Sequence, residues 1–383
     1  MIDVVNKQDC CGCTACYSIC PKSAITMVPD AQGFLYPKVD ESLCVECGLC
    51  ESVCSFNDSY DTELNLVEPK AFAARHKQLD EVEKSRSGAV FVALTNKVLD
   101  MGGVVYGAGL GTHLSVIHKR ATTREERDEF RKSKYVQSDL GNTFNKIKNE
   151  LKKDRLVYFS GTPCQVAGLS SFVGPKLRKN LVLQDIVCHG VPGPKVWGDY
   201  VSFIEKRENK IPIGVDFRDK NRFGWDDHKE SFIFADCKKS FDIYSYLFNL
   251  QLIFRESCKV CYYTNMRRPS DITLGDFWGF QNVDAQFNLD NKGVSLVLCN
   301  TVKGVNLLES VKNDLNTIPV EDLSKCMQPN LQHPTRFHPL HDDFVKDYTT
   351  KGFKYALYKY GNVNVVKRFK RFIKKYILRK KVF

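Results

Sequence analysis

Eight cysteines near the N-terminus occur in two runs of the same spacing, and this repeat constrains the fold more than any other feature of the chain. The two runs are Cys10, Cys13, Cys16 and Cys20, and Cys44, Cys47, Cys50 and Cys54. Each run reads C-x2-C-x2-C-x3-C. Three thiolates at this spacing fall on one tight loop, and the fourth opens a helix that can reach toward the other run. The repeat therefore predicts a small module with two paired metal centres.

This spacing is the ligand pattern of bacterial-type ferredoxins, in which the fourth cysteine of each run completes the opposite 4Fe–4S cluster. We therefore expect one cluster on Cys10, Cys13, Cys16 and Cys54, and a second on Cys20, Cys44, Cys47 and Cys50. Zinc knuckles or a disulfide framework would also use thiols, but neither requires this spacing twice. Cys11 stands next to a ligand and is expected to bind no iron.

Composition places the chain in a reducing compartment. The sequence has 383 residues and 16 cysteines, but its N-terminus lacks the layout of a signal peptide and no run of 18 apolar residues occurs. We therefore expect a cytoplasmic protein whose thiols serve metal. Residues 351–383 hold 12 of the 56 Lys and Arg and none of the Asp and Glu. The rest of the chain is close to neutral, which argues against nucleic-acid binding.

The pattern beyond the cysteine runs predicts a larger second domain. Residues 57–70 are polar and read as a linker, and strands and helices then alternate from 71 to 206. Helices are expected at 87–101, 123–134, 142–153 and 194–206. This alternation favours an α/β domain with a mostly parallel sheet, and strand candidates after residue 211 favour a mixed one. The expected fold class is α+β to α/β: a ferredoxin module at 1–57, a mixed-sheet domain at 70–345 and a basic helical tail at 350–383.

The tail has the pattern of an amphipathic helix. Its apolar side chains repeat at helical spacing among nine Lys and Arg, at Val365, Phe369, Phe372, Ile373 and Tyr376. A basic helix of this kind suits an anionic membrane surface, which would place the protein at the membrane periphery. A solvated helix or an arm that docks on a partner protein fits the pattern nearly as well.

Four further cysteines have notable positions. Cys164 and Cys188 follow consecutive predicted strands, and Cys258 and Cys261 form a C-x2-C pair. In open α/β sheets the carboxyl edge of the strands is where ligands bind. The four thiols could therefore hold a third cluster or a zinc ion, but buried unligated thiols fit the spacing as well. Cys237, Cys299 and Cys326 belong to no motif and are expected in the core.

Two turns that precede predicted helices could hold a phosphate or a flavin. One is Ser85-Arg86-Ser87-Gly88, and the other is Ser160-Gly161-Thr162-Pro163. Free N–H groups at a helix N-terminus attract anions. Ordinary helix capping by Ser or Thr also explains both turns, so the residues alone leave both interpretations open.

Five short motifs of the larger domain stand out together. They are Arg86-Ser87-Gly88, Ser133-Lys134-Tyr135-Val136-Gln137-Ser138, Phe159-Ser160-Gly161-Thr162-Pro163-Cys164-Gln165, Cys188-His189-Gly190-Val191-Pro192 and Gly275-Asp276-Phe277-Trp278-Gly279. As a set they resemble the coenzyme F420 hydrogenase/dehydrogenase beta-subunit family, in the form that has a two-cluster ferredoxin domain at its N-terminus. The resemblance covers roughly residues 1–300.

This resemblance implies an iron–sulfur flavoprotein with FAD in the α/β domain. It implies a third 4Fe–4S cluster nearby, on Cys164, Cys188, Cys258 and Cys261. The FAD contacts implied by the motifs are Ser87, Gly88, Lys134, Tyr135, Gly161, Thr162, Pro163, Asp276 and Trp278. Family members exchange a hydride with coenzyme F420, but no residue of this chain identifies a pocket for that coenzyme.

Three functions remain open on the sequence. The first is an oxidoreductase that passes electrons between ferredoxin, or another redox protein, and a hydride donor or acceptor such as F420. The second is an electron-transfer subunit of a larger complex with no substrate of its own. The third is a non-enzymatic adaptor whose clusters only stabilise its fold. A flavin exchanges single electrons with clusters and hydrides with organic molecules, so FAD would favour the first function.

Overall fold

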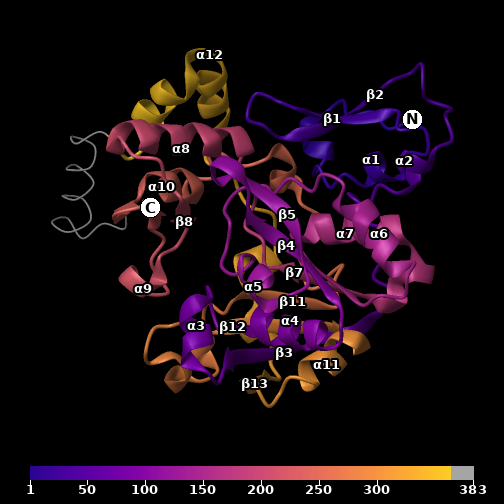
Figure 1. The fold of residues 1–383 in the computed structure, drawn as a ribbon, viewed down its shortest axis with the longest axis vertical. Helices are drawn as coiled ribbons and strands as arrows, with labels where there is room; N and C mark the ends of the chain where they lie inside the picture. Colours follow the sequence, from indigo (N-terminus) through magenta and orange to yellow (C-terminus); the bar gives the residue numbers. More distant parts are fainter. Residues whose placement is uncertain (364–383) are drawn as a thin grey trace.

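The computed structural model describes residues 1–363, and its N-terminal part is a small module around one hairpin (Figure 1). The hairpin joins β1 (Ile25–Pro29) and β2 (Leu35–Val39), which pair antiparallel. The short helices α1 (Ala15–Ile19) and α2 (Leu49–Ser52) lie beside it, preceded by the 3₁₀ turn η1 (Lys7–Asp9). Each helix follows a residue with positive φ, Thr14 and Gly48. This sharp bend turns three cysteines of each run onto one loop.

An eight-stranded mixed sheet forms the centre of the larger domain. Its strands, in spatial order, are β13 (Leu315–Val320), β3 (Asn65–His76), β12 (Ser295–Thr301), β11 (Ile272–Asp276), β7 (Leu181–Ile186), β6 (Val157–Ser160), β4 (Val104–Leu110) and β5 (Val116–Ala121). The four strands from β11 to β4 are parallel, and the strands on either side pair antiparallel. Because both faces of the parallel strands are covered, most of their residues are apolar, and polar residues such as Gln184, Asp185 and Thr273 are buried among them. The expectation of a mixed sheet after a ferredoxin module is confirmed.

Helices cover both faces of this sheet. One face packs against α4 (Val90–Asp100) and α11 (Val302–Glu309), with α3 (Leu79–Lys84) at the edge of the sheet. The other face packs against α6 (Thr143–Leu151) and α7 (Pro163–Val173). The ferredoxin module lies on these two helices and shares their hydrophobic core (Figure 1). The module is therefore a third layer on one side of the sheet.

The helix expected at 123–134 is shorter than its periodicity indicates. Helix α5 covers Arg124–Asp128 and begins with a capping box between Thr123 and Glu126. The chain then leaves the helix, because the Phe130 ring packs on Gly107 of β4, where a Cβ atom would lie 2.8 Å from the ring. Residues 131–134 therefore form a loop, with Lys132 at positive φ.

A smaller layer beside the sheet contains three strands and four helices. Its strands are β8 (Gly214–Asp216), β9 (Glu230–Ile233) and β10 (Lys238–Phe241), in the order β10-β9-β8. Its helices are α8 (Pro194–Glu208), α9 (Lys220–Phe223), α10 (Ile243–Asn249) and α12 (His341–Tyr360). Aromatic rings fill its core, and Trp197 contacts the rings of Phe217, Phe232 and Tyr244. Helix α12 belongs to this layer, since Phe344, Tyr348 and Leu357 are buried there.

Short 3₁₀ turns complete the connections. They are η2 (Thr112–Leu114), η3 (Pro175–Asn180), η4 (Glu256–Val260), η5 (Phe280–Asn282), η6 (Ala285–Asn288), η7 (Leu323–Cys326) and η8 (Pro329–Leu331). None of the helices within residues 1–363 combines the length and apolar character that a bilayer crossing requires. The apolar stripe predicted from Val365 to Tyr376 lies outside the described residues.

Gly88 illustrates how tightly the turn before α4 packs on the sheet. Its N–H donates to Ser295 Oγ at 3.0 Å and its carbonyl accepts from the His76 N–H at 2.7 Å. A Cβ atom at this position would collide with the carbonyl oxygen of Ala74. Only glycine therefore lets this turn approach β3 and β12.

We expect Gly88→Ala to lower the free energy of unfolding by about 1–3 kcal/mol, because the added methyl group must displace backbone. Gly198→Ala is the matched control, since Gly198 lies in α8 with open space around it and alanine favours a helix by about 0.5–1 kcal/mol. Chemical denaturation of both variants measures the difference. A Gly88→Ala protein as stable as the wild type would contradict this packing.

Candidate cluster sites and the adjoining cavity

The first thiol group combines three cysteines of the first run with the last cysteine of the second. Burial raises the pKa of Cys10, and the charges of Cys13 and Cys54 raise it further. Burial and the charges of Cys13 and Cys10 likewise raise the pKa of Cys16. Cys54 therefore lies with Cys10, Cys13 and Cys16, in the crossed arrangement that the two-cluster spacing predicts.

The second thiol group lies at the outer end of the module. Cys20, Cys44, Cys47 and Cys50 line one small hollow. Backbone N–H groups of Ala24 and Ile2 donate to the sulfurs of Cys20 and Cys50, each at 3.3 Å. Cys47 is exposed, whereas Cys13 and Cys16 of the first group are buried. The second group is thus the one that solvent or a partner protein reaches.

The third thiol group brings together four cysteines from three distant parts of the chain. Cys164 is the second residue of α7, Cys188 follows β7, and Cys258 and Cys261 lie in and just after η4. Burial and the charges of Cys164 and Cys261 raise the pKa of Cys188 to about 12. Burial and the charges of Cys188 and Cys261 also raise the pKa of Cys258. The structure therefore places the C-x2-C pair beside both strand-end cysteines.

Cys11 lies between the first and third groups. Its buried thiol lies beside the thiols of Cys13 and Cys164, one from each group, and hydrogen bonding with these thiols raises the pKa of Cys11. The hydrogen bond from Cys11 lowers the pKa of Cys164 to about 7. Apart from its position beside Cys10, no pattern in the sequence predicts this place for Cys11. The side chain of Cys11 therefore links the first thiol group to the third.

Arg255 joins the ferredoxin module to the larger domain. Its buried guanidinium donates to the carbonyls of Cys10 and Leu35, both at 2.9 Å, and to Gln137 Oε1 at 3.0 Å. The guanidinium also lies 4.2 Å from the ring centre of Tyr36. Gln137 in turn donates to the Cys11 carbonyl at 2.8 Å. These bonds fix the first thiol group relative to η4 and therefore to the third group.

A cavity of about 550 Å³ opens at the carboxyl ends of the parallel strands, next to the third thiol group. It is lined by Cys188 and by seven of the nine predicted cofactor residues: Ser87, Lys134, Tyr135, Gly161, Thr162, Asp276 and Trp278. This edge of the sheet is where open α/β folds bind ligands, and the volume lies within the range of small-molecule pockets.

The other two predicted cofactor residues do not line this cavity, and their positions have structural reasons. Gly88 is pressed against Ala74 and Ser295 of the sheet. Pro163 is buried as the first residue of α7, where its missing N–H costs no hydrogen bond. Within residues 1–363, both serve the packing around the cavity rather than its wall.

The wall of the cavity carries two buried arginines and one aspartate. Arg218 donates to Asp276 at 2.6 Å, and Arg86 Nε lies 3.8 Å from the same carboxylate. Burial alone would raise the pKa of Asp276, but the two guanidinium groups hold it below its usual range. Arg86 donates through Nη2 to the Trp225 carbonyl, whereas its Nε and Nη1 atoms have no hydrogen-bond partner among residues 1–363. This guanidinium is therefore available to an anionic oxygen.

Lysine and histidine side chains add to the polar wall. Burial lowers the pKa of Lys134 to about 7, and its ammonium donates to the carbonyls of Glu129 and Arg131. Burial also lowers the pKa of His118 and of His228 to about 4. Both imidazoles are consequently neutral near pH 7. The cavity combines a lysine whose pKa lies near 7, two guanidinium groups paired with Asp276, and neutral imidazole rings.

Sequence reasoning missed several of these side chains. Arg86 stood inside a recognised motif but was not assigned a role, and Arg218, His118 and His228 belonged to no motif. A buried arginine has no sequence signal, since most arginines are exposed.

We expect Arg255→Gln to loosen the module from the larger domain by about 2–4 kcal/mol, because the carbonyls of Cys10 and Leu35 would lose a charged donor. Hydrogen exchange of the holoprotein should then show faster exchange at residues 10–16 and 34–37. Arg207→Gln, on the exposed end of α8, is the control and should leave those amides unchanged. Equal protection in the Arg255 variant would contradict the role of this contact.

Comparison with known proteins identifies both parts of the chain. Residues 9–57 match the 4Fe–4S dicluster domain, and residues 154–323 match the C terminus of the coenzyme F420 hydrogenase/dehydrogenase beta subunit. An uncharacterized ferredoxin from Methanocaldococcus jannaschii is 31% identical over 67 residues, which are 18% of this chain and 82% of the ferredoxin.

Among solved structures, a chain of the xenon-derivatized F420-reducing [NiFe] hydrogenase complex from Methanosarcina barkeri is similar, with a TM-score of 0.47 and 15% identity. The alignment covers 85% of this chain and 98% of that one. The matched C-terminal region includes Cys164, Cys188, Cys258 and Cys261, and the dicluster match includes both cysteine runs. The chain belongs to the coenzyme F420 hydrogenase/dehydrogenase beta-subunit family and has an iron–sulfur electron-transfer domain, of the 4Fe–4S dicluster type, at its N-terminus.

Proposed function

We propose that this protein is an iron–sulfur flavoprotein oxidoreductase. It passes electrons between 4Fe–4S clusters and an FAD-linked hydride donor or acceptor, either F420 or another organic substrate. The observation that carries the proposal is the cavity, which adjoins Cys188 and gathers seven residues that the family resemblance associates with FAD. Electrons enter or leave the protein through residues 1–57, and residues 70–345 form the flavin domain.

The thiol groups suit three clusters. Each group offers four cysteines, the number that a 4Fe–4S cluster requires. In the third group, burial raises the pKa values of Cys188, Cys258 and Cys261. Thiols of this kind are ionised by a bound metal rather than by solvent. We assign Cys10, Cys13, Cys16 and Cys54 to one cluster, Cys20, Cys44, Cys47 and Cys50 to the second, and Cys164, Cys188, Cys258 and Cys261 to the third.

The order of the groups gives a route for electrons. The second group is the exposed one, the first group is buried behind it, and Cys11 connects the first group to Cys164 of the third. Cys188 of the third group reaches the cavity wall. FAD, when bound, supplies the exchange between single electrons and a hydride. In this proposal, the residues that line the cavity hold FAD at the end of the electron route.

The cavity residues bind and orient the cofactor in this proposal. Arg86 receives an anionic oxygen through its unpartnered Nε and Nη1 atoms. Asp276 holds Arg218 in place through their 2.6 Å ion pair, and Arg218 lies 5.4 Å from the ring centre of Trp278. Tyr135 accepts from Arg218 at 3.2 Å. Neutral His118 and His228 add polar contacts without a second charge.

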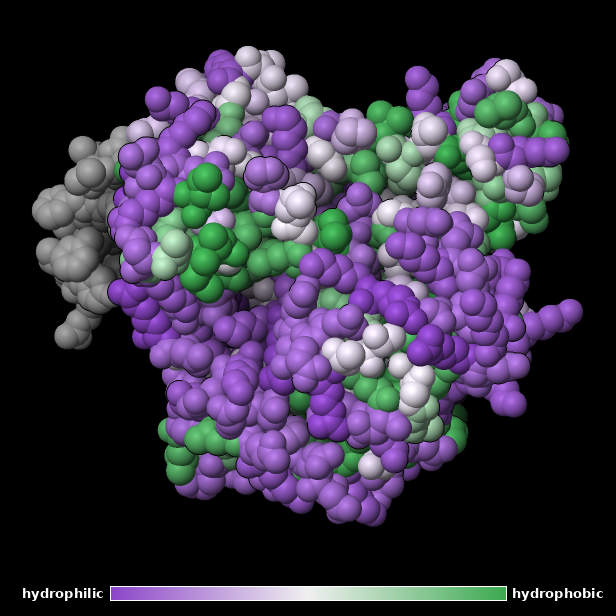
Figure 2. Space-filling view, viewed as in Figure 1, coloured by the Kyte–Doolittle hydropathy of each residue, from purple (hydrophilic) through white to green (hydrophobic). Residues whose placement is uncertain are grey.

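A second candidate function is an electron-transfer subunit without a substrate of its own. The surface of the ferredoxin module favours it, because apolar side chains are exposed there: Val45 and Leu49 beside the second thiol group, and Val5, Val28 and Leu43 elsewhere on the module. Figure 2 shows hydrophobic residues gathered on this module, whereas the lower part of the same face is largely hydrophilic. Such a surface suits a redox protein, ferredoxin or a partner subunit of a complex. Turnover of a hydride donor by the isolated protein separates the two functions.

We expect Cys258→Ala to lower the iron content of anaerobically purified protein by about four atoms per chain, since one cluster would be lost. Cys47→Ala should cause a similar loss from the exposed group. Cys237→Ala is the control, because Cys237 lies outside all three thiol groups and contacts Lys210. Iron analysis and low-temperature EPR measure the effect. An unchanged iron content in Cys258→Ala, or zinc in place of iron, would contradict the third cluster.

We expect FAD affinity to fall as pH rises from 6 to 8. Burial and the nearby Lys132 charge lower the pKa of Lys134 to about 7, whereas Glu129 and Asp216 oppose this shift. The charged form that attracts phosphate is thus present below pH 7 and is lost above it. Fluorescence titration of protein stripped of flavin should show a change of about tenfold.

Lys134→Met should remove this pH dependence and weaken binding at pH 6, whereas Lys152→Met, on an exposed turn after α6, should behave as the wild type. Absence of FAD binding at any pH would contradict the proposed function. Binding with the same pH dependence in Lys134→Met would contradict only the role of this lysine.

A further inference from the structure

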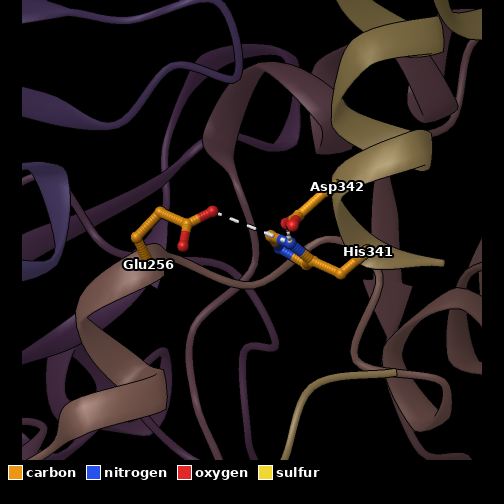
Figure 3. Close-up of side chains that lie close together, drawn as sticks. All are labelled: Glu256, His341 and Asp342. Atoms are coloured by element: carbon orange, nitrogen blue, oxygen red, sulfur yellow. Dashed lines mark hydrogen bonds and ion pairs between the residues drawn. The ribbon is translucent and has the colours of Figure 1, made fainter. Parts of the chain in front are cut away.

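A second group of ligand-type side chains lies at the start of α12, apart from the thiols and the cavity. His341 Nδ1 lies 3.0 Å from Asp342 Oδ1 and 3.7 Å from Glu256 Oε1. One ligand atom from each of the three residues falls within 4.8 Å of the others. Figure 3 shows the imidazole between the two carboxylates, with Glu256 pointing from η4 and the other two from α12. Two segments that are 85 residues apart thus converge on one point.

The surroundings of His341 fix which of its nitrogens faces the carboxylates. The residue is 2% exposed, and its Nε2 atom lies 3.3 Å from the Phe254 carbonyl oxygen. A carbonyl only accepts hydrogen bonds, so Nε2 carries the hydrogen. The ring of Phe337, at 4.5 Å between centres, packs against the imidazole. Nδ1 therefore faces two carboxylates, where it either carries a proton that is donated to Asp342 Oδ1 or offers its lone pair to a metal ion.

Either a proton on Nδ1 or a metal ion can lie among these three electron-pair donors. We propose that His341, Asp342 and Glu256 bind a divalent transition-metal ion of the zinc type. Zinc takes one nitrogen and two oxygens at about 2.0–2.2 Å, which places tetrahedral ligand atoms about 3.3–3.5 Å apart. The distances from His341 Nδ1, 3.0 Å to Asp342 Oδ1 and 3.7 Å to Glu256 Oε1, lie on either side of this spacing. The Phe254 carbonyl has the role that an outer partner of a metal-bound histidine usually has, which is to fix its tautomer.

Because of its position, an ion bound at this site would join two separate elements of the fold. Glu256 opens η4, the turn that also carries Cys258, and His341 opens α12. Helix α12 begins without a side-chain cap on its first N–H groups. An ion at this point joins the beginning of α12 to the turn that presents a thiol of the third group. The fourth position faces water, since the Asp342 side chain is 90% exposed.

The experiment measures zinc binding to the holoprotein under anaerobic conditions, with the clusters assembled so that their thiols are occupied. Equilibrium dialysis against zinc, followed by metal analysis, compares the wild type with Asp342→Ala and Glu256→Ala. Asp343→Ala is the matched control, because Asp343 is the next residue of the same helical turn and is exposed. Iron content is measured in every sample, and hydrogen exchange of residues 341–349 is recorded with and without zinc.

We expect one zinc ion per wild-type and Asp343→Ala chain, and affinity at least roughly tenfold weaker in Asp342→Ala and in Glu256→Ala, as each loses one ligand. Zinc should slow exchange at the start of α12 in the wild type and the control only. His341→Ala should abolish the site, but it opens a buried space, so the two carboxylate variants decide. The proposal is overturned if the wild type binds no zinc beyond the level of Asp342→Ala, which would mean that His341 holds only a proton. Because iron content reports the clusters separately, this outcome leaves the proposed function untouched.

Discussion

The arrangement of the whole molecule depends on one buried charge, the guanidinium of Arg255. A charge taken out of water costs several kcal/mol unless every donor is satisfied, and this one is satisfied largely by the ferredoxin module, through the carbonyls of Cys10 and Leu35. Gly12 has room for no side chain, because a Cβ atom would lie 2.9 Å from the guanidinium. This buried contact, together with the hydrophobic core shared with α6 and α7, therefore sets how the module sits on the larger domain.

The proximity of the thiol groups follows from this contact. Cys13 packs on α7 so closely that a Cβ atom at Gly168 would lie 2.7 Å from its sulfur. Cys164 stands at the start of the same helix, and Cys11 forms hydrogen bonds with both thiols. The parallel strands then deliver Cys188 to the sheet edge at which the cavity opens. Cys11, helix α7 and the parallel strands thus each place one part of the path between the exposed thiols and the cavity.

Local patterns predicted part of this structure, and long-range packing decided the rest. The doubled cysteine spacing and the alternation of strands and helices led to the ferredoxin module and the mixed sheet, because both depend on short-range periodicity. The helix expected to reach Lys134 ends at Asp128, since Phe130 turns to pack on Gly107. Gly88 and Pro163 were predicted as cofactor contacts from motif alone; they do not line the cavity, and their roles as cofactor contacts stay predictions. The roles of Arg255 and Cys11 come from contacts more than 100 residues apart, which periodicity cannot reveal.

Electron transfer from the exposed thiol group to the cavity is the central claim, and rapid-mixing spectroscopy of the flavin-loaded holoprotein tests it most directly. Reduced ferredoxin is mixed with the protein, and the absorbance of the clusters and of the flavin is followed together. We expect flavin reduction to follow cluster reduction in the wild type and in Cys237→Ala, and to stop in Cys258→Ala while the module still accepts electrons. Flavin reduction at the wild-type rate in Cys258→Ala would contradict this electron route.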